Sequence, residues 1–289
     1  MNSDNLDGNV VMLLSSFSPD VVLADRVSAC HGIRMNRGNG RSAYPIITPK
    51  DSWRPLTTDE LRSVCGTWNN SLGRGTYIGV FEVSATALSR CVEYLDWYFS
   101  ETKKSLEECK ARVADLSLFQ EVYSLRGDEG DSFLGVASAQ PDMRVVTIDR
   151  DVDCLVGLHF DNFDKLPLKE RSRGRNRICI NVGSESRFFM FVRSQAHALL
   201  ETVISKSDAD PDLRTRLITD HRELVFRYFT MFPETVVYRV ELKPGEGYMA
   251  PTENIIHEGS TLGTHAVDWT MVWFGRFRWC NLKLTSQIG

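Results

Sequence analysis

The chain lacks an excess of basic residues. Of its 289 residues, 34 are Lys or Arg and 38 are Asp or Glu, which gives a formal net charge of −4 at pH 7. Proteins that bind nucleic acids in general need a clear excess of cations for their phosphate contacts. We therefore expect no general nucleic-acid binding, and we expect a small molecule as the partner.

A long hydrophobic run is also missing. Residues 1–4 contain no Lys or Arg, and the apolar run 10–14 is shorter than an export or membrane segment requires. We expect a cytoplasmic protein that has no membrane segment. The oligomeric state stays open, with a homo-oligomer among the options.

No pair of cysteines has the C-x-x-C spacing. The seven cysteines lie far apart, at positions 30, 65, 91, 109, 154, 179 and 280. This spacing favours neither a disulfide framework nor a structural zinc site. We expect most of them to be buried thiols.

Hydrophobic residues make up 42% of the chain, which is ordinary for a folded protein. No internal repeat or linker is visible, so we expect one domain over residues 1–289. We expect a mixed α/β support over 1–130 and the core of the domain over 131–280. Within the support, the apolar positions of 84–113 recur at helical spacing and predict one long helix or two in tandem.

Two pairs of residues have the spacing of a capping box, in which a hydroxyl residue and a glutamate close the start of a helix. Thr57 and Glu60 form the first pair, directly after a proline, and predict the start of a short helix. Ser105 and Glu108 form the second pair.

The C-terminal half is rich in short β-branched and aromatic runs, which indicate strands. A helical pattern at 195–230 interrupts them. We expect a mainly β fold with flanking helices, an antiparallel sandwich or barrel that carries a helical insertion. The predicted strands cover 133–139, 144–149, 153–161, 177–183, 187–193, 235–242, 253–257 and 267–278.

Two residues of the predicted strand 153–161 are placed to bind one metal. Because side chains alternate along a strand, His159 and Asp161 lie on one face, whereas Leu158 and Phe160 lie on the other. The imidazole and the carboxylate then converge on one point, as two ligands of a single metal must.

We expect the third ligand from a later strand. His257 ends the short run 253–257, which follows a Pro/Gly turn. Two His and one Asp form the facial triad that suits ferrous iron and leaves coordination positions open, although zinc hydrolases use similar ligands. The competing pair His221 and Glu223 falls in a helical pattern, where residues two apart point to nearly opposite sides.

The pattern of His159, Asp161 and the distal His257, set in this series of strands, resembles the Fe(II)/2-oxoglutarate-dependent oxygenases. The resemblance covers roughly residues 130–280. It implies a double-stranded β-helix, a cupin-like jelly roll that has the metal at one mouth. It also implies that Fe(II), 2-oxoglutarate as cosubstrate and O₂ take part. Because Asp161 is present, the site does not resemble the halogenating branch, which has a small residue there.

The same resemblance implies a basic residue that binds the far carboxylate of 2-oxoglutarate. Arg276 is the positional candidate, 19 residues past His257 on the last predicted strand. Arg187 and Arg177 are the alternatives. A guanidinium is favoured because its fork matches a carboxylate with two hydrogen bonds.

Five of the nine residues in 169–177 are basic. In a jelly roll this run borders the mouth of the site, because it follows the strand that carries His159. It is either a rim that attracts anionic ligands or a solvated loop. The first interpretation predicts a small carboxylate-bearing substrate, such as an amino acid or a biosynthetic intermediate.

Other polar and aromatic residues have simpler interpretations. We expect His197 and His221 to be helix residues without a chemical role. Thr252, Glu253 and Asn254 either shape the substrate pocket or form a turn. The aromatic residues of the last strand are expected to form core against the helices: Trp269, Trp273, Phe277 and Trp279.

The leading hypothesis is a non-haem iron oxygenase. It would couple the oxidative decarboxylation of 2-oxoglutarate to hydroxylation, desaturation or ring closure of a small metabolite. Two alternatives use the same fold. One is a cupin-like metal-dependent hydrolase or isomerase that holds zinc or manganese at the triad, and the other is a jelly-roll binding module without catalytic activity.

Overall fold

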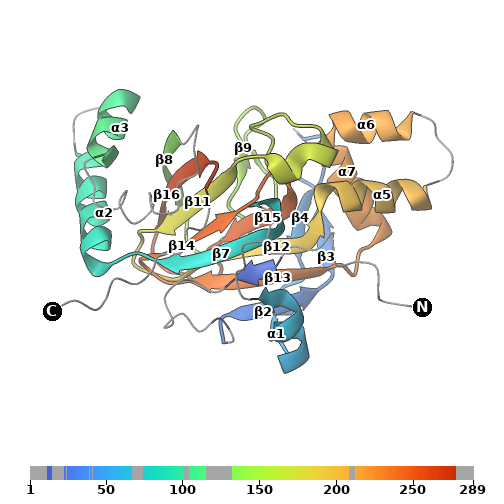
Figure 1. Ribbon diagram of the computed structural model, residues 1–289, viewed down its shortest axis with the longest axis horizontal. Helices are drawn as coiled ribbons and strands as arrows, with labels where there is room; N and C mark the ends of the chain where they lie inside the picture. The colour runs from blue at the N-terminus through green and yellow to red at the C-terminus, as the bar shows by residue number, and fades with distance from the viewer. Residues whose placement is uncertain are drawn as a thin grey trace.

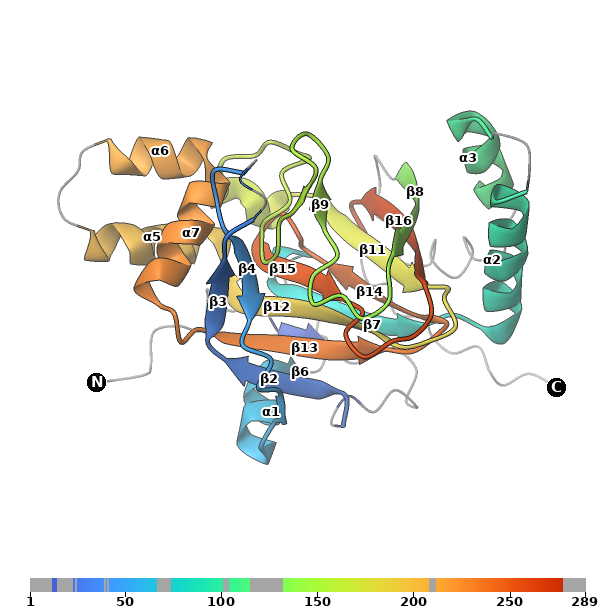
Figure 2. The ribbon, with the colours of Figure 1, turned by 180° about the vertical axis from the view of Figure 1, so that it is seen from behind.

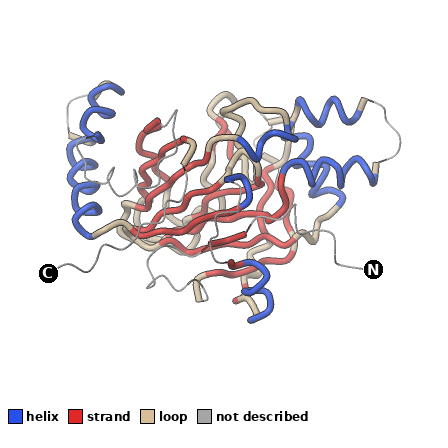
Figure 3. Tube along the Cα trace, in the orientation of Figure 1, coloured by secondary structure: helices blue, strands red, loops and turns tan. Residues whose placement is uncertain are grey.

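The structure is a computed structural model, and two β-sheets form its centre with helices at both ends (Figures 1 and 3). The structure describes residues 12–14, 23, 25–38, 40, 42–66, 74–100, 104–114, 132–207 and 212–277.

The larger sheet has seven strands in the order β6-β1-β7-β14-β11-β16-β8. In that order they are Cys65–Gly66, Met12–Leu14, Tyr77–Glu82, Glu246–Ala250, Asn176–Asn181, Asp268–Gly275 and Ser132–Ala139. The smaller sheet has five strands in the order β15-β12-β13-β2-β5. These are Ile255–Ser260, Arg187–Gln195, Val236–Leu242, Val27–His31 and Arg54–Pro55.

The chain crosses from one sheet to the other at most of its connections. β11, β14 and β16 belong to the larger sheet, whereas β12, β13 and β15 belong to the smaller one. The steps β11 to β12, β13 to β14, β14 to β15 and β15 to β16 therefore all change sheet. Neighbouring strands of this core are antiparallel. This is the path of a jelly roll, or double-stranded β-helix, so the predicted mainly β fold class is confirmed.

Alternation along the strands builds a core on each side of the larger sheet. Cys179 of β11 points toward the smaller sheet and packs with Phe189, Phe191 and Tyr248. Its neighbour Ile178 points the other way, into the layer beneath two helices. These helices are α2 (Ala85–Tyr98) and α3 (Leu106–Ala114), which stand at one end of the molecule in Figure 1.

The helical insertion covers the opposite end. It consists of α5 (Ala196–Lys206), α6 (Leu213–Thr219) and α7 (His221–Met231), which follow β12. Figure 2 shows the hairpin of β3 (Ile33–Asn36) and β4 (Ile46–Pro49) between these helices and the sheets. Apolar residues of the hairpin and the helices share one buried cluster. None of the described helices is long and apolar enough to cross a membrane.

Several predicted elements are confirmed. α1 (Thr58–Val64) begins at Thr57 with the capping box to Glu60. Ser105 and Glu108 form the same reciprocal pair of hydrogen bonds ahead of α3. The pattern over 84–113 is two helices rather than one. The six described cysteines are free thiols, and five of them are buried; Cys280 lies outside the described residues.

The predicted regular strands over 144–149 and 153–161 are wrong. Only β9 (Ile148–Asp149) and β10 (Cys154–Leu155) form there, as a short hairpin. Gly157 ends the extended run because its φ is +77°. A Cβ at this position would lie 2.2 Å from the carbonyl oxygen of Ile47, so the two backbones touch.

Candidate metal centre

His159 and His257 lie directly opposite each other on adjacent segments. Each donates its backbone N–H to the carbonyl of the other, at 3.1 and 2.9 Å. In an antiparallel pair, opposed side chains point to the same face. The two imidazole ring centres are accordingly 4.7 Å apart. His159 thus takes its position from this single bridge, although the segment around it is not a regular strand.

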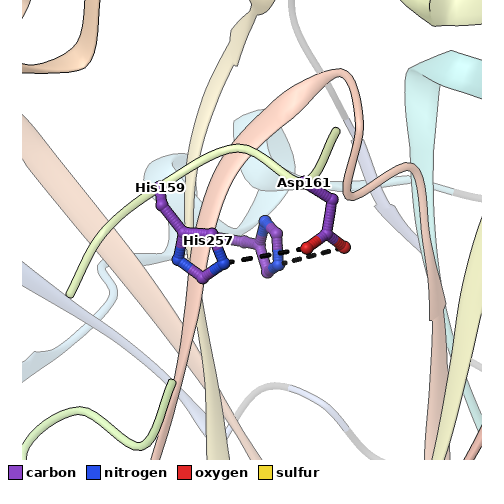
Figure 4. A group of neighbouring side chains, drawn as sticks. All are labelled: His159, Asp161 and His257. Carbon is purple, nitrogen blue, oxygen red and sulfur yellow. Dashed lines mark ion pairs between the residues drawn. The ribbon is translucent and has the colours of Figure 1, made fainter. Parts of the chain in front are cut away.

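Asp161 brings the carboxylate to the same point. Its backbone N–H donates to the carbonyl of Thr252 at 3.0 Å, which ties this segment to the turn before β15. Asp161 Oδ1 lies 3.7 Å from His159 Nε2, and Oδ2 lies 3.7 Å from His257 Nε2. Figure 4 shows the three side chains pointing toward one another. The sequence predicted this convergence, and the structure shows it.

Both imidazoles direct the same nitrogen toward the shared centre. His159 Nδ1 lies 2.7 Å from the carbonyl of Gly157, and His257 Nδ1 lies 3.3 Å from that of Ile255. A carbonyl oxygen accepts only from an N–H, so the proton sits on Nδ1 of each neutral ring. The lone pair of each Nε2 is then available to a metal.

The spacing of these atoms fits one metal ion. A metal that binds neighbouring ligands at about 2.1 Å separates them by about 3.0 Å when the ligand–metal–ligand angle is near 90°. The observed 3.7 Å contacts need only a small closure to reach that value. The candidate ligand atoms of the three residues all lie within 4.8 Å of one another.

Burial and neighbouring charges shift the pKa of each candidate ligand, upward for His159 and downward for His257 and Asp161. Burial would lower the pKa of His159, but the carboxylates of Asp161 and Glu258 outweigh it and raise the pKa to about 10. Burial lowers the pKa of His257 to about 4. Burial would raise the pKa of Asp161, but Arg177 and the two histidines hold it well below its ordinary value. A divalent cation satisfies the same carboxylates.

Glu258 is a second buried carboxylate behind His159. Its Oε1 accepts hydrogen bonds from the N–H groups of Val146, Thr147 and Gly259 and from the Thr147 hydroxyl, at 2.8 to 3.3 Å. Its Oε2 makes no hydrogen bond to a described residue and lies 3.5 Å from His159 Nδ1. Glu258 therefore lies where it can fix the orientation of His159.

The basic run 169–177 is not a uniform solvated rim. Arg171 is buried, and its Nη1 donates to the carbonyls of Asp161 and Glu253 at 3.0 and 3.1 Å. Arg175 pairs with Asp164. Within 169–177, only Lys169 and Arg173 are exposed cations. The expectation of a steering rim is therefore wrong for Arg171, which holds the loop that carries Asp161.

The three candidate arginines for 2-oxoglutarate have different surroundings. Arg177 Nη2 lies 2.8 Å from Asp161 Oδ2, so this cation contacts a candidate metal ligand. Arg276 is exposed and follows the end of β16. Arg187 is buried at the start of β12, where its Nη1 lies 3.0 Å from Asp268 Oδ2.

The remaining candidates fall in two groups. His197 is exposed on α5. His221 instead lines a small, mostly apolar pocket together with His159 and Tyr44. Glu253 and Asn254 are buried structural residues: Glu253 accepts from the N–H groups of Phe163 and Asp164, and Asn254 donates to the Gly75 carbonyl.

The predicted aromatic core is confirmed where the structure describes it. Trp273 and Phe277 are buried beneath α2 and α3, and Trp269 packs against them. Trp279 lies outside the described residues.

Sequence reasoning missed Glu258, Arg171 and Asp268. The sequence signal for Glu258 was its place directly after the candidate ligand His257. In the structure it is fully buried, and a charged side chain is seldom fully buried unless it is paired. Arg171 and Asp268 gave no signal of this kind: Arg171 lies in a run of basic residues, and the partner of Asp268 is distant in sequence.

Matches to known proteins come from solved structures. No protein-family model and no curated protein matches the sequence. Three similar structures are of the Kdo hydroxylase KdoO, described as a non-haem Fe(II) alphaketoglutarate-dependent dioxygenase, with cobalt(II), with succinate and Fe(III), and in the apo form. Each of the three is 12% identical to this chain, with a TM-score of 0.38 and a match that covers 71% of this chain. The match covers 81% of KdoO in the cobalt(II) structure, 80% in the succinate structure and 81% in the apo structure.

Proposed function

We propose that this protein is an Fe(II)- and 2-oxoglutarate-dependent oxygenase of a small molecule. The observation that carries the proposal is the convergence of His159 Nε2, His257 Nε2 and the Asp161 carboxylate on one buried point. This donor set suits non-haem ferrous iron and leaves coordination positions for other ligands. When bound, the iron and 2-oxoglutarate supply the oxidising chemistry with O₂.

The chain's own residues hold and orient the reactants. With a metal bound, His159 and His257 would present the lone pairs of their Nε2 atoms, because each Nδ1 lies within hydrogen-bonding distance of a backbone carbonyl. Arg177 keeps Asp161 ionised and in place. Burial of Asp161 and His257 to below one tenth exposure keeps bulk water from these ligands.

We infer that Arg187 binds the far carboxylate of 2-oxoglutarate. The guanidinium is buried and lies over Gly259, two residues past His257 on the neighbouring strand. Arg177 is paired with Asp161, a candidate metal ligand, whereas the partner of Arg187 is Asp268, which is not a candidate ligand. Arg276 lies exposed beyond the end of β16. These contacts support Arg187 over the other two.

The substrate that we propose is a small molecule with an apolar part and a carboxylate, such as an amino acid or a biosynthetic intermediate. Phe163, two residues after Asp161, is 53% exposed and offers an aromatic surface beside the site. The exposed Lys169 and Arg173 follow in the same loop. Hydroxylation is the proposed outcome, and desaturation or ring closure needs the same ligands.

Succinate production tests the proposal. The protein is loaded anaerobically with Fe(II), and 2-oxoglutarate, ascorbate and air are then added. We expect succinate and CO₂ even without substrate, at the slow rate of uncoupled turnover. The His159→Ala and His257→Ala variants should bind no iron and form no succinate, whereas His197→Ala, which changes an exposed histidine on α5, should match the parent.

Other outcomes point to the alternatives. Tight binding of zinc or manganese without succinate formation would indicate a hydrolase or isomerase. Absence of metal binding in the parent would indicate a binding module. Equal succinate formation by the parent and His257→Ala would also overturn the proposal.

A further inference from the structure

A buried ion pair connects the two sheets inside the barrel. Arg187 stands at the start of β12 in the smaller sheet, and Asp268 stands at the start of β16 in the larger one. Their side chains are 8% and 5% exposed, and Nη1 lies 3.0 Å from Oδ2. The pair therefore sits in the interior with both charges almost fully removed from water.

Strand register places this pair next to the candidate metal centre. β12 pairs with β15, so that Phe191 lies opposite His257 and Phe189 lies opposite Gly259. Arg187 is two residues before Phe189 and shares its face. A Cβ on Gly259 would lie 2.6 Å from Arg187 Nη2, so the guanidinium lies against the strand two residues from His257. A glycine at 259 leaves the space that the guanidinium fills.

The charge on Arg187 is already balanced. Besides Asp268, the groups that act on Arg187 are Tyr248 on β14, Cys179 on β11 and Glu258 on β15, and none of them is a cation. A second carboxylate that reached this guanidinium would place two anions beside one cation in the interior. Like charges in a buried site raise the cost of ionising both, so one of the carboxylates tends to hold a proton.

We propose that Asp268 determines how the cosubstrate binds, by taking up a proton from solvent when the far carboxylate of a 2-oxo dicarboxylic acid pairs with Arg187. The proton converts the Asp268 carboxylate to a neutral acid, so the site gains one anion and loses another. Binding of the dicarboxylic acid is then favoured at low pH. This inference rests on the proposed function, because it assumes that 2-oxoglutarate is the ligand.

The ionisation of Asp268 is consistent with this role. Burial raises the pKa of Asp268, and Arg187 only partly opposes the shift, so the carboxyl takes up a proton more readily than an exposed aspartate.

Calorimetry on the parent protein tests the proposal without a variant. The protein is loaded with Mn(II) and titrated anaerobically with 2-oxoglutarate in two buffers whose ionisation enthalpies differ. We expect uptake of about one proton for each molecule bound and a Kd that rises about tenfold for each pH unit above neutrality. 2-Oxopentanoate has the same number of carbons but no far carboxylate, and its binding should take up no proton.

A variant assigns the proton to its residue. Asp268→Asn keeps an oxygen toward Arg187 and removes the titration, so its Kd for 2-oxoglutarate should not vary between about pH 6 and about pH 9. Asp142→Asn serves as the matched control, because the described hydrogen-bond partner of the Asp142 carboxylate is the N–H of Gly263, in an exposed turn. Its Kd should vary with pH as that of the parent does, and circular dichroism checks that each variant is folded.

The outcomes separate this inference from the proposed function. If 2-oxoglutarate binds to the parent without proton uptake, or if Asp268→Asn keeps the pH dependence, the role of Asp268 is overturned and the oxygenase proposal stands. If neither the parent nor Asp268→Asn binds 2-oxoglutarate, both are overturned.

Discussion

Glu258 shows how one buried side chain positions a candidate metal ligand. The segment 142–161 leaves β15 after Met143 and returns at His159, so between these points no described backbone group pairs with this edge of β15. The Oε1 atom of Glu258 accepts the N–H groups of Val146 and Thr147 at that gap. Its Oε2 atom is left for His159 Nδ1, at 3.5 Å. One carboxylate therefore holds the displaced segment through hydrogen bonds and lies beside the imidazole as a charge partner.

We predict that Glu258→Gln weakens the metal affinity by about 10–100-fold, because a carboxylate behind a histidine fixes the ring and raises its basicity. Titration calorimetry with Mn(II) measures the affinity, and the absorption spectrum of the Co(II) form reports the geometry of the site. A merely structural role would leave that spectrum unchanged.

Glu246→Gln is the matched control for this prediction. Glu246 is equally a buried glutamate in a strand, but it pairs with Arg26 and contacts no candidate ligand. Its loss should lower stability and leave the metal affinity as it is. Equal effects of the two substitutions on metal affinity would refute the role of Glu258.

Two of the unpredicted site residues, Asp268 and Glu258, act on partners that are far away along the chain. His159 and Asp161 are two residues apart, so their relation can be worked out from local geometry. Asp268 meets Arg187, and Glu258 meets Thr147, only after the sheets have formed. A sequence on its own gives no register between such segments, so these contacts could not be predicted.

At the scale of elements, Arg171 organises the loop between Asp161 and β11. The loop includes the 3-10 helix η2 (Leu168–Arg173), and Arg171 reaches from it to two backbone carbonyls and to Asn162 Oδ1, at 2.9 to 3.1 Å. One of these carbonyls belongs to Asp161 itself. The loop is therefore the support for a candidate ligand.

We predict that Arg171→Met lowers the free energy of unfolding by about 3 kcal/mol, because it leaves buried carbonyls without their charged donor. Arg173→Met, two residues away on an exposed side chain, should change it by less than about 0.5 kcal/mol. Urea unfolding followed by circular dichroism gives both values. Similar losses in the two variants would mean that the loop is held by other contacts.

The start of α7 predicts a pH dependence of stability. Burial, aided by Arg171, lowers the pKa of His221 to about 4, from an ordinary value near 6.5. Because the folded pKa lies below the unfolded one, the neutral imidazole stabilises the fold above about pH 6.5. This contribution is lost as the pH falls toward 4.

His221→Gln removes that titration. Between about pH 7 and about pH 4 the parent should therefore lose about 2–3 kcal/mol more stability than the variant. Urea unfolding at several pH values measures the difference, with His197→Gln as the exposed control. Parallel losses in the parent and His221→Gln would show that His221 takes up its proton as easily when folded as when unfolded.

β11 and β13 match the predicted runs within one or two residues, although five of the six residues of β11 are buried. β14 was not predicted, because its Glu-Gly start follows a Pro/Gly turn. The segment 153–161 was predicted as a strand from its alternation, but the positive φ of Gly157 interrupts it.

At the scale of the whole molecule, the jelly roll brings the candidate ligands together from separate parts of the chain. His159 and Asp161 precede β11, whereas His257 lies on β15, with β12, the helical insertion, β13 and β14 in between. The unfolded chain holds these residues far apart. A metal at the triad therefore binds the folded state. It joins two segments of the chain, at 159–161 and at 257, that are separated by about one hundred residues.

This arrangement predicts that the metal stabilises the whole domain. At a free metal concentration one hundred times the Kd, binding to the folded state alone adds about 2.7 kcal/mol to the free energy of unfolding. For a chain of this size that corresponds to a rise of about 4–5 °C in Tm. Thermal unfolding with Mn(II), and again after a chelator is added, measures the shift and its reversal. His257→Ala should lose the whole shift and His197→Ala should keep it, since only the first removes a ligand. A shift that survives in His257→Ala would place the stabilising metal elsewhere, and the triad would then have no bearing on the stability of the fold.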